Sequence, residues 1–531
     1  MLSTFRQSMT WLHTWCGVVA GWALFAVFVS GTLAVFRQEI DYWMTPELQV
    51  PFESGELLSV SQHALQQLAP AAVRWVIELP TDRAPVLRLR WQTGPKDRLQ
   101  SRYIDSAGKP LSPRETGGGS MIYRFHYGLL LGRTGMWIVG GLAMAMLVAL
   151  VSGIIIHAKI FREFFTFRPR RPAPRAWLDA HTVCSVAVLP FSLKITYSGL
   201  VIWWFIWMPG GLDLAYSGER ASFFRDMAPA VAERTVGSNG PAPLTDLAGI
   251  AREASGAAPN HLRLTSVSVQ NPGSAGARVE VVRTSDVALW GDSDRLRFDG
   301  VSGELLDRVV EQGAPAYVAH RIIRILHEAK FASLGLRWLF FAMAGVCCAM
   351  IATGTVLWGT KRRIKHVKAF AARGLTRTGA FAAFGVDVMN VGVIAGLCTA
   401  ISAYFIANRL IPAGIGGRAD AEVAVFFLSW LGCACVAIAF LLVSHRRFAS
   451  ADGARTALRR LWGWQWMLAA GLAAAIIPLD EITTRGIGRA VARGDGIVLS
   501  FHASLFAAAL GMFWIACMAL RPLVATQRRQ P

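Results

Sequence analysis

The sequence is poor in charge and especially poor in acid. Only 17% of its 531 residues are charged and 53% are hydrophobic, and 34 Asp and Glu face 54 Lys and Arg. An ordinary soluble domain carries about 25% charged residues, so this composition favours a membrane protein. The sequence has no Walker motif, no GxGxxG after a strand and no nucleophile–base signature. ATP-driven transport and a nicotinamide- or flavin-binding domain are therefore unsupported.

Cysteine is absent from both long polar segments of the chain. All eight cysteines lie in or beside apolar runs, which argues against a disulfide framework outside the membrane. The sequence also has no CxxCH motif, so covalently attached haem is not expected.

Apolar runs long enough to cross a bilayer, about 20 residues each, recur eight times. The first, within residues 1–36, is too long and aromatic for a cleavable signal, so we interpret it as a retained helix. The others are predicted at 135–158, 181–207, 337–359, 384–407, 421–444, 463–479 and 497–520. The last four form a C-terminal transmembrane extension, 384–520.

Basic residues gather between alternate pairs of spans. The N-terminus, the segments around 159–180, 360–383 and 444–462, and the tail 521–531 hold 22 Lys and Arg but three acids. The positive-inside rule places these segments, and both termini, in the cytoplasm. Segments 37–134 and 208–336 then face outward. The net charge of +20 is therefore explained by the cytoplasmic segments of a protein in a lipid bilayer. It does not require a nucleic-acid partner.

The first and third spans share one spacing. His13 precedes Gly31, and His181 precedes Gly199, by 18 residues, and each glycine follows a serine. Eighteen residues make about five helical turns with a rise of about 27 Å. The histidine and the glycine of each span therefore lie on one helix face, near opposite membrane surfaces.

The second and fourth spans repeat in the same way. His126 precedes Gly153, and His327 precedes Gly354, by 27 residues. The outward segments correspond too, because each is predicted to hold a helix (58–68 and 244–254), three strands and a similar turn sequence, "YIDSAGKPL" or "FDGVSGELL". We predict a duplicated core in which each repeat is a span, a small α+β domain and a span. A pseudo-two-fold axis along the membrane normal would relate the repeats.

Five histidines are candidate ligands. Neutral imidazole is a common axial ligand of haem iron, and the repeats supply His13 with His181 inside, and His126 with His327 outside. His157 has no repeat counterpart and is a further cytoplasmic-side candidate. Which two of His13, His157 and His181 bind iron stays open, although the symmetry favours His13 with His181.

The glycines offer flat patches against which a haem can lie: Gly31 and Gly199 at the outer level, Gly153 and Gly354 at the inner level. Glycine in membrane helices also simply lets two helices approach, and histidines at membrane surfaces also bond headgroups or loop carbonyls. Both readings stay open at this point.

Few ionisable groups lie within the spans. Lys194 is expected to pair with a haem propionate or a carboxylate, or to snorkel outward, and Asp387 poses a similar question. Asp480 and Glu481, at the end of the seventh span, are expected to be solvated. His502 is expected to have a structural role or to belong to a quinone site.

The segments "LHTWCGVVAGWALFAVFVSGTLAVFRQEID" and "FHYGLLLGRTGMWIVGGLAMAMLVALVSGIIIHAKIF" resemble the PepSY-associated transmembrane family over about residues 1–365. That family includes iron-regulated inner-membrane proteins and ferric-siderophore reductases of Gram-negative bacteria. The resemblance implies two non-covalent haems b in a four-helix core and periplasmic PepSY-like domains. It also implies that the five candidate histidines match the family's histidines.

The sequence therefore predicts a polytopic α-helical protein of the bacterial inner membrane that carries electrons to a ferric siderophore and releases Fe(II). The electron donor is expected to be a cytoplasmic protein or a quinol. The alternatives are a non-redox siderophore permease and a membrane-anchored PepSY binding scaffold.

Overall fold

The structure is a computed structural model of the chain. It describes residues 2–51, 56–157, 168, 173–219, 221–223, 240–256, 262–285, 293–310, 315–370, 377–444 and 451–521, so the predicted basic loops and the tail 521–531 lie partly outside the described residues. Two compact units emerge. The first comprises Met1–Ile40, Glu115–Thr196 and Phe341–Pro531, and the second comprises Asp41–Arg114 and Tyr197–Phe340.

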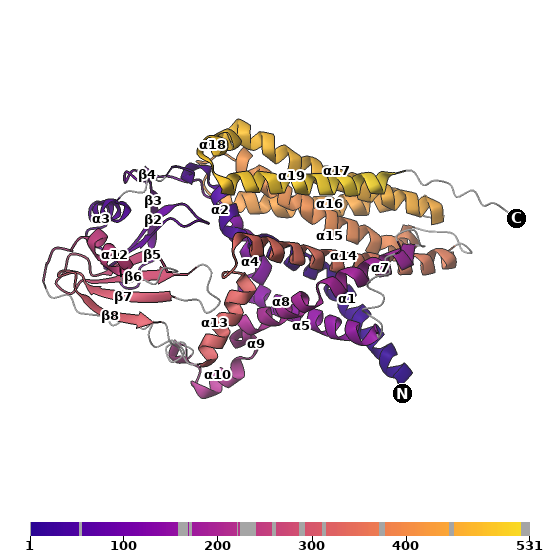
Figure 1. Cartoon of the computed structure of the whole chain (residues 1–531). Coiled ribbons are helices and arrows are strands. Elements are labelled where there is room, and N and C mark those ends of the chain that lie inside the picture. The colour runs from indigo at the N-terminus through magenta and orange to yellow at the C-terminus, as the bar shows by residue number, and fades with distance from the viewer. Residues whose placement is uncertain are drawn as a thin grey trace. The chain divides into compact units, whose positions relative to one another are not determined.

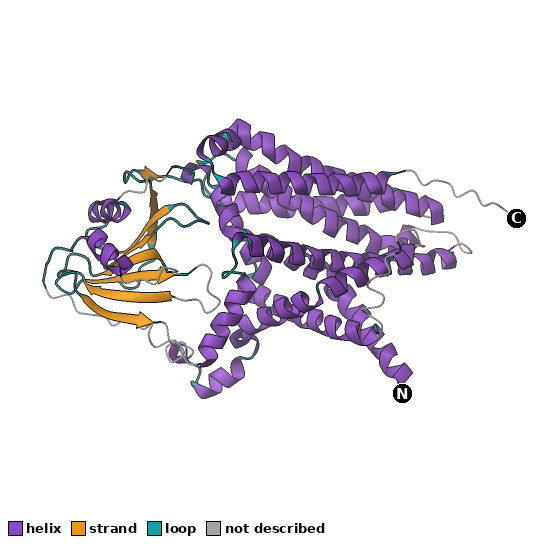
Figure 2. Cartoon of the chain, viewed as in Figure 1, coloured by secondary structure: helices purple, strands orange, loops and turns teal. Residues whose placement is uncertain are grey.

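Long apolar helices dominate the chain (Figure 2). Within the described residues, seven helices are long and apolar enough to cross a membrane, and a bent pair makes eight if it counts as one span. The seven are α1 (Leu2–Ala34), α5 (Gly132–Ile156), α14 (Leu334–Phe370), α15 (Arg377–Leu410), α16 (Arg418–Val443), α17 (Ala451–Thr484) and α19 (Gly496–Leu520). The chain is thus a multi-pass membrane protein, as predicted from the apolar runs.

The third span differs from the single helix predicted at 181–207. It consists of α7 (Ala173–Ala187) and α8 (Leu189–Ile202), which are bent by 67° at Val188. Pro190 explains the break, because proline has no N–H to donate and its ring crowds the carbonyl four residues earlier. The expected continuous span is therefore wrong in this detail.

Shorter helices connect these elements. They are α2 (Arg37–Met44), a 3₁₀ turn (Pro46–Leu48), α4 (Gly118–Gly128), α9 (Trp204–Trp207), α10 (Pro209–Ala215), α13 (Pro315–Glu328) and α18 (Gly486–Arg493). Helix α4, which carries His126, directly precedes α5 in the first unit.

The C-terminal extension packs as four helices, α15, α16, α17 and α19, which run side by side (Figure 1). Helix α15 also contacts α1 and α14. Its Asn390 accepts a hydrogen bond from Trp22 of α1 (2.8 Å) and donates one to the Thr355 carbonyl of α14 (3.1 Å). Its Asp387 accepts one from Arg363 of α14 (2.8 Å). Asp387 is therefore paired, as its position inside a span requires.

Asp480 is buried, not solvated as the sequence suggested. Its side chain is 1% exposed, and its carboxylate lies 2.5 Å from Arg409 Nε and 2.9 Å from His502 Nε2. The partners come from α15 and α19, which cover the end of α17. Sequence position relative to one helix end gives no information about neighbouring helices, which explains the error.

The second unit contains one antiparallel sheet of eight strands. The strands are β1 (Arg74–Glu78), β2 (Leu87–Gln92), β3 (Gln100–Ile104), β4 (Pro110–Leu111), β5 (Arg263–Gln270), β6 (Arg278–Thr284), β7 (Ser293–Asp299) and β8 (Leu305–Val310). Their order is β4-β3-β2-β1-β5-β6-β7-β8. The two predicted α+β segments therefore form one sheet, not two separate domains. Pairing β1 with β5 satisfies backbone groups that each half would otherwise expose at its edge.

Each half of the sheet keeps the predicted helix and turn. Helix α3 (Leu57–Leu68) precedes the first half and α12 (Leu247–Gly256) the second. In the corresponding turns, the carboxylates of Asp105 and Asp299 each accept two backbone N–H groups. Gly108 and Gly303 follow at φ 83° and 77°, a conformation that glycine adopts without strain.

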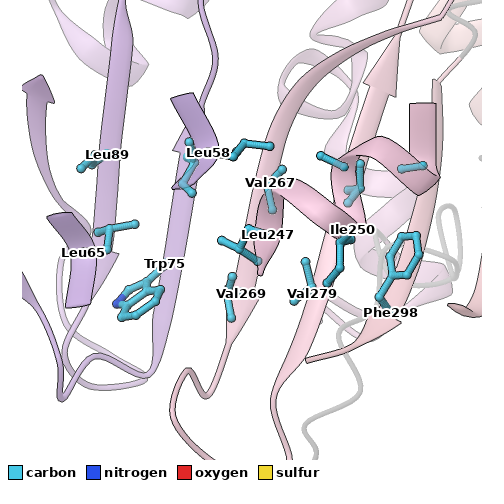
Figure 3. Packing of buried hydrophobic residues seen from close by; sticks show 14 of the residues in the cluster. Leu58, Leu65, Trp75, Leu89, Leu247, Ile250, Val267, Val269, Val279 and Phe298 are labelled. Carbon is cyan, nitrogen blue, oxygen red and sulfur yellow. The ribbon is translucent and has the colours of Figure 1, made fainter. Parts of the chain in front are cut away.

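Both halves share one hydrophobic core. Figure 3 shows its side chains, from Leu65 of α3 and Trp75 of β1 to Val279 of β6 and Phe298 of β7. The Gln62 side chain joins the two helices, because it donates to the Thr245 carbonyl (3.0 Å) and accepts from the Leu247 N–H (2.9 Å). The common core explains why neither half needs to be stable alone.

One arginine points into this core. Strand β6 alternates buried and half-buried residues, and Arg283 occupies a buried position. Its guanidinium binds the Asp294 carboxylate and the Ala254 carbonyl, and Arg308 also contacts Asp294 (2.8 Å). Burial alone raises the pKa of Asp294, but the hydrogen bonds and charges of the two arginines outweigh it and hold the pKa below its usual value.

Replacing Asp294 by asparagine is expected to destabilise the sheet by about 3–5 kcal/mol, because a buried guanidinium loses its charge partner. Hydrogen exchange of the β6 and β7 amides in the full chain measures this loss. Because the folded pKa is depressed, the stabilisation is present above about pH 4 and disappears as the pH falls through the folded pKa. Asp82→Asn, which breaks the exposed pair with Arg263, should leave exchange unchanged, and equal effects of both substitutions would refute the assignment.

Candidate histidine sites

His13 and His181 each lie against a glycine of a facing helix. A Cβ atom on Gly153 of α5 would lie 3.2 Å from His13 Cε1, and one on Gly354 of α14 would lie 3.0 Å from His181 Cε1. These four residues, which we call the His13–His181 site, belong to the first unit. The absence of a side chain at each glycine is what lets the imidazole ring approach the helix.

The same contact recurs at the other two repeated histidines. In the first unit, a Cβ on Gly31 of α1 would lie 2.6 Å from His126 Cε1. In the second unit, a Cβ on Gly199 of α8 would lie 3.2 Å from His327 Cε1. From the sequence, each of these glycines was expected to lie at the same membrane level as one of these histidines and to leave room for a flat haem. The immediate neighbour of each glycine is the imidazole itself.

Three of the histidines also bond to a backbone carbonyl one turn before the facing glycine. A carbonyl only accepts, so the imidazole Nδ1 carries the proton and donates it. The Nε2 atom is then left with its lone pair, which is the form that binds a metal. The pairs are His13 Nδ1 with Ala149 O (2.8 Å), His126 Nδ1 with Val27 O (2.7 Å) and His181 Nδ1 with Met350 O (2.9 Å).

The hydroxyl residue before each glycine belongs to the same arrangement. Ser30 donates to the Val27 carbonyl (3.0 Å), Ser152 to the Ala149 carbonyl (3.1 Å) and Thr353 to the Met350 carbonyl (3.0 Å). These are the carbonyls that accept from the histidines. Sequence reasoning noted Ser30-Gly31 and Ser198-Gly199, but it missed that Ser152-Gly153 and Thr353-Gly354 complete the pattern.

His327 makes a different bond. Its Nδ1 lies 2.8 Å from the Ser198 hydroxyl, which can donate or accept. The tautomer of His327 is thus not determined by this contact. Ser198 is buried, at 4% exposure, so the hydroxyl fixes the ring orientation in either case.

The rings of His13 and His181 lie near each other in an edge-to-face arrangement. Their centroids are 6.3 Å apart, and their planes make an angle of 65°. Two imidazoles that share one metal place each ligating nitrogen about 2 Å from it. The ring centroids then lie about 6 Å apart, which is the separation seen here. In the described part of the chain, no group of three or more His, Cys, Asp or Glu is arranged to hold a bare metal ion.

The side chains of His157 and Lys194 are not among those nearest to the four facing glycines. His157 is half-buried at the end of α5, where its backbone N–H donates to the Gly153 carbonyl (3.2 Å). It therefore lies one turn from the His13–His181 site. Lys194 Nζ lies 5.5 Å from the ring centroid of Phe191, one turn earlier on α8.

His126 is on α4, outside the membrane-spanning helices. Burial lowers the pKa of His126, and the hydrogen bond to the Val27 carbonyl offsets part of that effect. The ring is therefore neutral at pH 7, in agreement with the tautomer that the Val27 carbonyl selects.

A family model described as the PepSY-associated TM region matches residues 10–361. A search of curated proteins gave no match. The matched region contains all five candidate histidines and all four facing glycines, whereas α15 and the helices after it lie beyond its end. Since the match covers more than half of the sequence, the chain belongs to the PepSY-associated TM region family.

Proposed function

We propose that this protein is a di-haem b electron-transfer protein that reduces ferric siderophore at the periplasmic side of the bacterial inner membrane and thereby releases Fe(II). The proposal joins the family membership to the chemistry of the histidines. It makes the protein an oxidoreductase of iron uptake. The ferric chelate is its substrate, and the electron donor is a cytoplasmic protein or a quinol.

The His13–His181 site is the observation that carries the proposal. Its two imidazoles are spaced as two axial ligands of one iron, and backbone carbonyls hold both rings in the tautomer that leaves Nε2 free to ligate. An interfacial histidine that only bonds a carbonyl needs no such partner ring. The alternative of His157 as a ligand has less support, because no glycine in the described part of the chain faces its ring.

His126 and His327 are proposed as the ligands of the second haem. Each repeats the contact with a facing glycine within its own unit. His126 also repeats the bond from Nδ1 to a carbonyl. Their pairing with one another rests on the repeat in the sequence, in which they are equivalent residues.

Bound haem supplies a one-electron couple at its iron. The chain's part is to hold the imidazoles and to tune them, because a hydrogen bond from Nδ1 raises the basicity of a histidine ligand. The rings at the glycines are half-buried, and burial is a further determinant of potential. Lys194 stays a proposed partner for a propionate group.

Reduction from Fe(III) to Fe(II) lowers the charge of the chelated metal and weakens its bonds to the hard oxygen ligands of a siderophore. The proposed orientation puts both termini in the cytoplasm and the sheet in the periplasm, as the distribution of basic residues predicts. In that orientation, His13 and His181 would hold a haem on the cytoplasmic side, where it would accept an electron, and His126 and His327 would hold one on the periplasmic side, where it would give one up.

A siderophore permease has less support. It needs a polar pathway near the middle of the membrane, and Asp387, one of the two charges that the sequence singled out within the spans, is already paired with Arg363. A binding scaffold has no use for the paired imidazoles. A reducible Soret band in the purified protein separates the proposal from both, and a colourless, folded preparation contradicts it.

His13→Ala and His181→Ala are each expected to reduce the haem content from two to one per chain, because each removes an axial ligand of the same iron. His157→Ala should keep both haems. Absorption spectra and haem quantification of the purified variants measure this. If His157→Ala loses a haem and His13→Ala does not, the ligand assignment at this site is wrong.

His126→Ala and His327→Ala are each expected to remove the other haem and to leave the His13–His181 haem spectrum unchanged. The double variant should lose no more haem than either single variant, since both side chains serve one iron. Retention of two haems in each single variant, by the same quantification, refutes the proposed pair.

Gly354→Ala is expected to weaken haem binding at the His13–His181 site by about 10–100-fold, because the new methyl group displaces the His181 ring from its carbonyl partner. Gly345→Ala on the same helix is the matched control, since nothing lies within 4 Å of a Cβ there. Haem titration of the apoprotein compares the two variants. Equal affinities would show that the glycine contact does not position the ring.

A further inference from the structure

Helix α4 carries His126 and is held between two parts of the first unit. On one side His126 meets Gly31 and Val27 of α1. Beside its contacts with α5 and with Arg37 of α2, α4 is also bound by α15 and α16, which lie beyond the region that matches the family. The function proposed above gives these later helices no role.

The N-terminal end of α4 is bound by a carboxylate from α16. Glu422 Oε2 accepts hydrogen bonds from the Gly117 N–H (3.0 Å) and the Thr116 hydroxyl (2.6 Å). A negative charge at this end of a helix is favourable, because the unpaired N–H groups and the helix dipole are positive there. Tyr404 of α15 adds a hydrogen bond from its hydroxyl to the Gly118 carbonyl (3.0 Å).

Glu422 is itself fixed inside the extension. It is fully buried, and it accepts from Arg418 Nη1 (2.5 Å) and Asn408 Nδ2 (2.8 Å), both of which are also fully buried. A buried carboxylate whose partners are all in place has one low-energy position. Asn408 accepts from Arg409, which continues the network to Asp480 and so to α17.

The last turns of α4 are held by aromatic rings. Phe125, the residue before His126, packs edge-to-face against three rings of α16, those of Phe426 (5.6 Å), Phe427 (6.1 Å) and Trp430 (6.3 Å). Neighbouring residues on a helix point about 100° apart. The α16 contacts at Phe125 therefore fix the rotation of α4 that turns His126 towards α1.

We infer that the C-terminal extension is a positioning device for His126: α15 and α16 set the axial location and the rotation of α4 through Glu422, Tyr404 and the three aromatic rings. The inference deepens the proposed function and rests on it where it concerns a haem ligand. The extension then determines the orientation of one axial imidazole, and with it the potential of one haem.

The test uses the full-length protein with Phe426→Leu and Tyr404→Phe, two changes that keep most of the side-chain volume. Leu428→Ala is the control on α16, because that side chain is 66% exposed. Glu481→Gln is the control for hydrogen bonding within the extension, because Glu481 accepts from the backbone of α18 and not from α4.

Hydrogen exchange of the α4 amides should become about three- to tenfold faster in both test variants and in neither control, since an aromatic pair or a buried hydrogen bond is lost. Haem content should stay at two. Potentiometric titration should show a shifted midpoint for one haem only, the one lost in His126→Ala, while the His13–His181 haem is unchanged.

Unchanged exchange in α4 would overturn the inference, and so would faster exchange with both midpoints at their wild-type values, since the elements outside the extension would then hold His126 without it. A wild-type protein that binds no haem would instead overturn the proposed function. The exchange comparison would still decide whether the extension holds α4, because it does not depend on haem.

Discussion

The close approach of an imidazole ring to a glycine on a facing helix is the contact on which the proposed function depends. At three positions the ring also donates to a carbonyl that already closes a helical turn, and a Ser or Thr hydroxyl donates to that same carbonyl. A larger residue in place of the glycine would push the ring away from this acceptor. The contact thus fixes the helix separation, the ring orientation and the tautomer together.

The remaining helices maintain these contacts. Asn390 of α15 binds both α1 and α14, next to the glycine that faces His181. Further along the same helix, Tyr404 binds the beginning of α4. One helix of the extension is thereby in contact with the surroundings of both His181 and His126. Buried polar groups make these contacts, so they specify one arrangement of the helices more strictly than apolar packing does.

The sequence predicted the membrane class, the approximate spans and the family, because long apolar runs and repeated spacings are local patterns. It also placed each glycine at the membrane level of the histidine that it contacts in the structure. Within the first and third spans this follows because 18 residues are close to five whole turns. It failed where the answer depends on another element. Asp480 looked solvated until α15 and α19 covered it, and two α+β segments looked separate until β1 paired with β5.

The break in the third span was visible in the sequence as Pro190, but length and hydropathy alone concealed it. The carbonyl acceptors could not be predicted, because backbone groups carry no sequence signal of their own. A hydroxyl residue before the glycine marked all three carbonyls, and only Ser30 among them was recognised from the sequence; the fourth hydroxyl, that of Ser198, bonds His327 directly. A search for Ser-Gly or Thr-Gly in every span would have found all four.

Iron K-edge X-ray absorption of the purified, oxidised protein tests the central claim most directly, because it reports the atoms bound to the metal. The account predicts iron whose axial ligands are imidazole nitrogens at about 2 Å, with no sulfur or water oxygen in their place. Iron with a thiolate or an oxygen ligand, or a folded protein without iron, would contradict it.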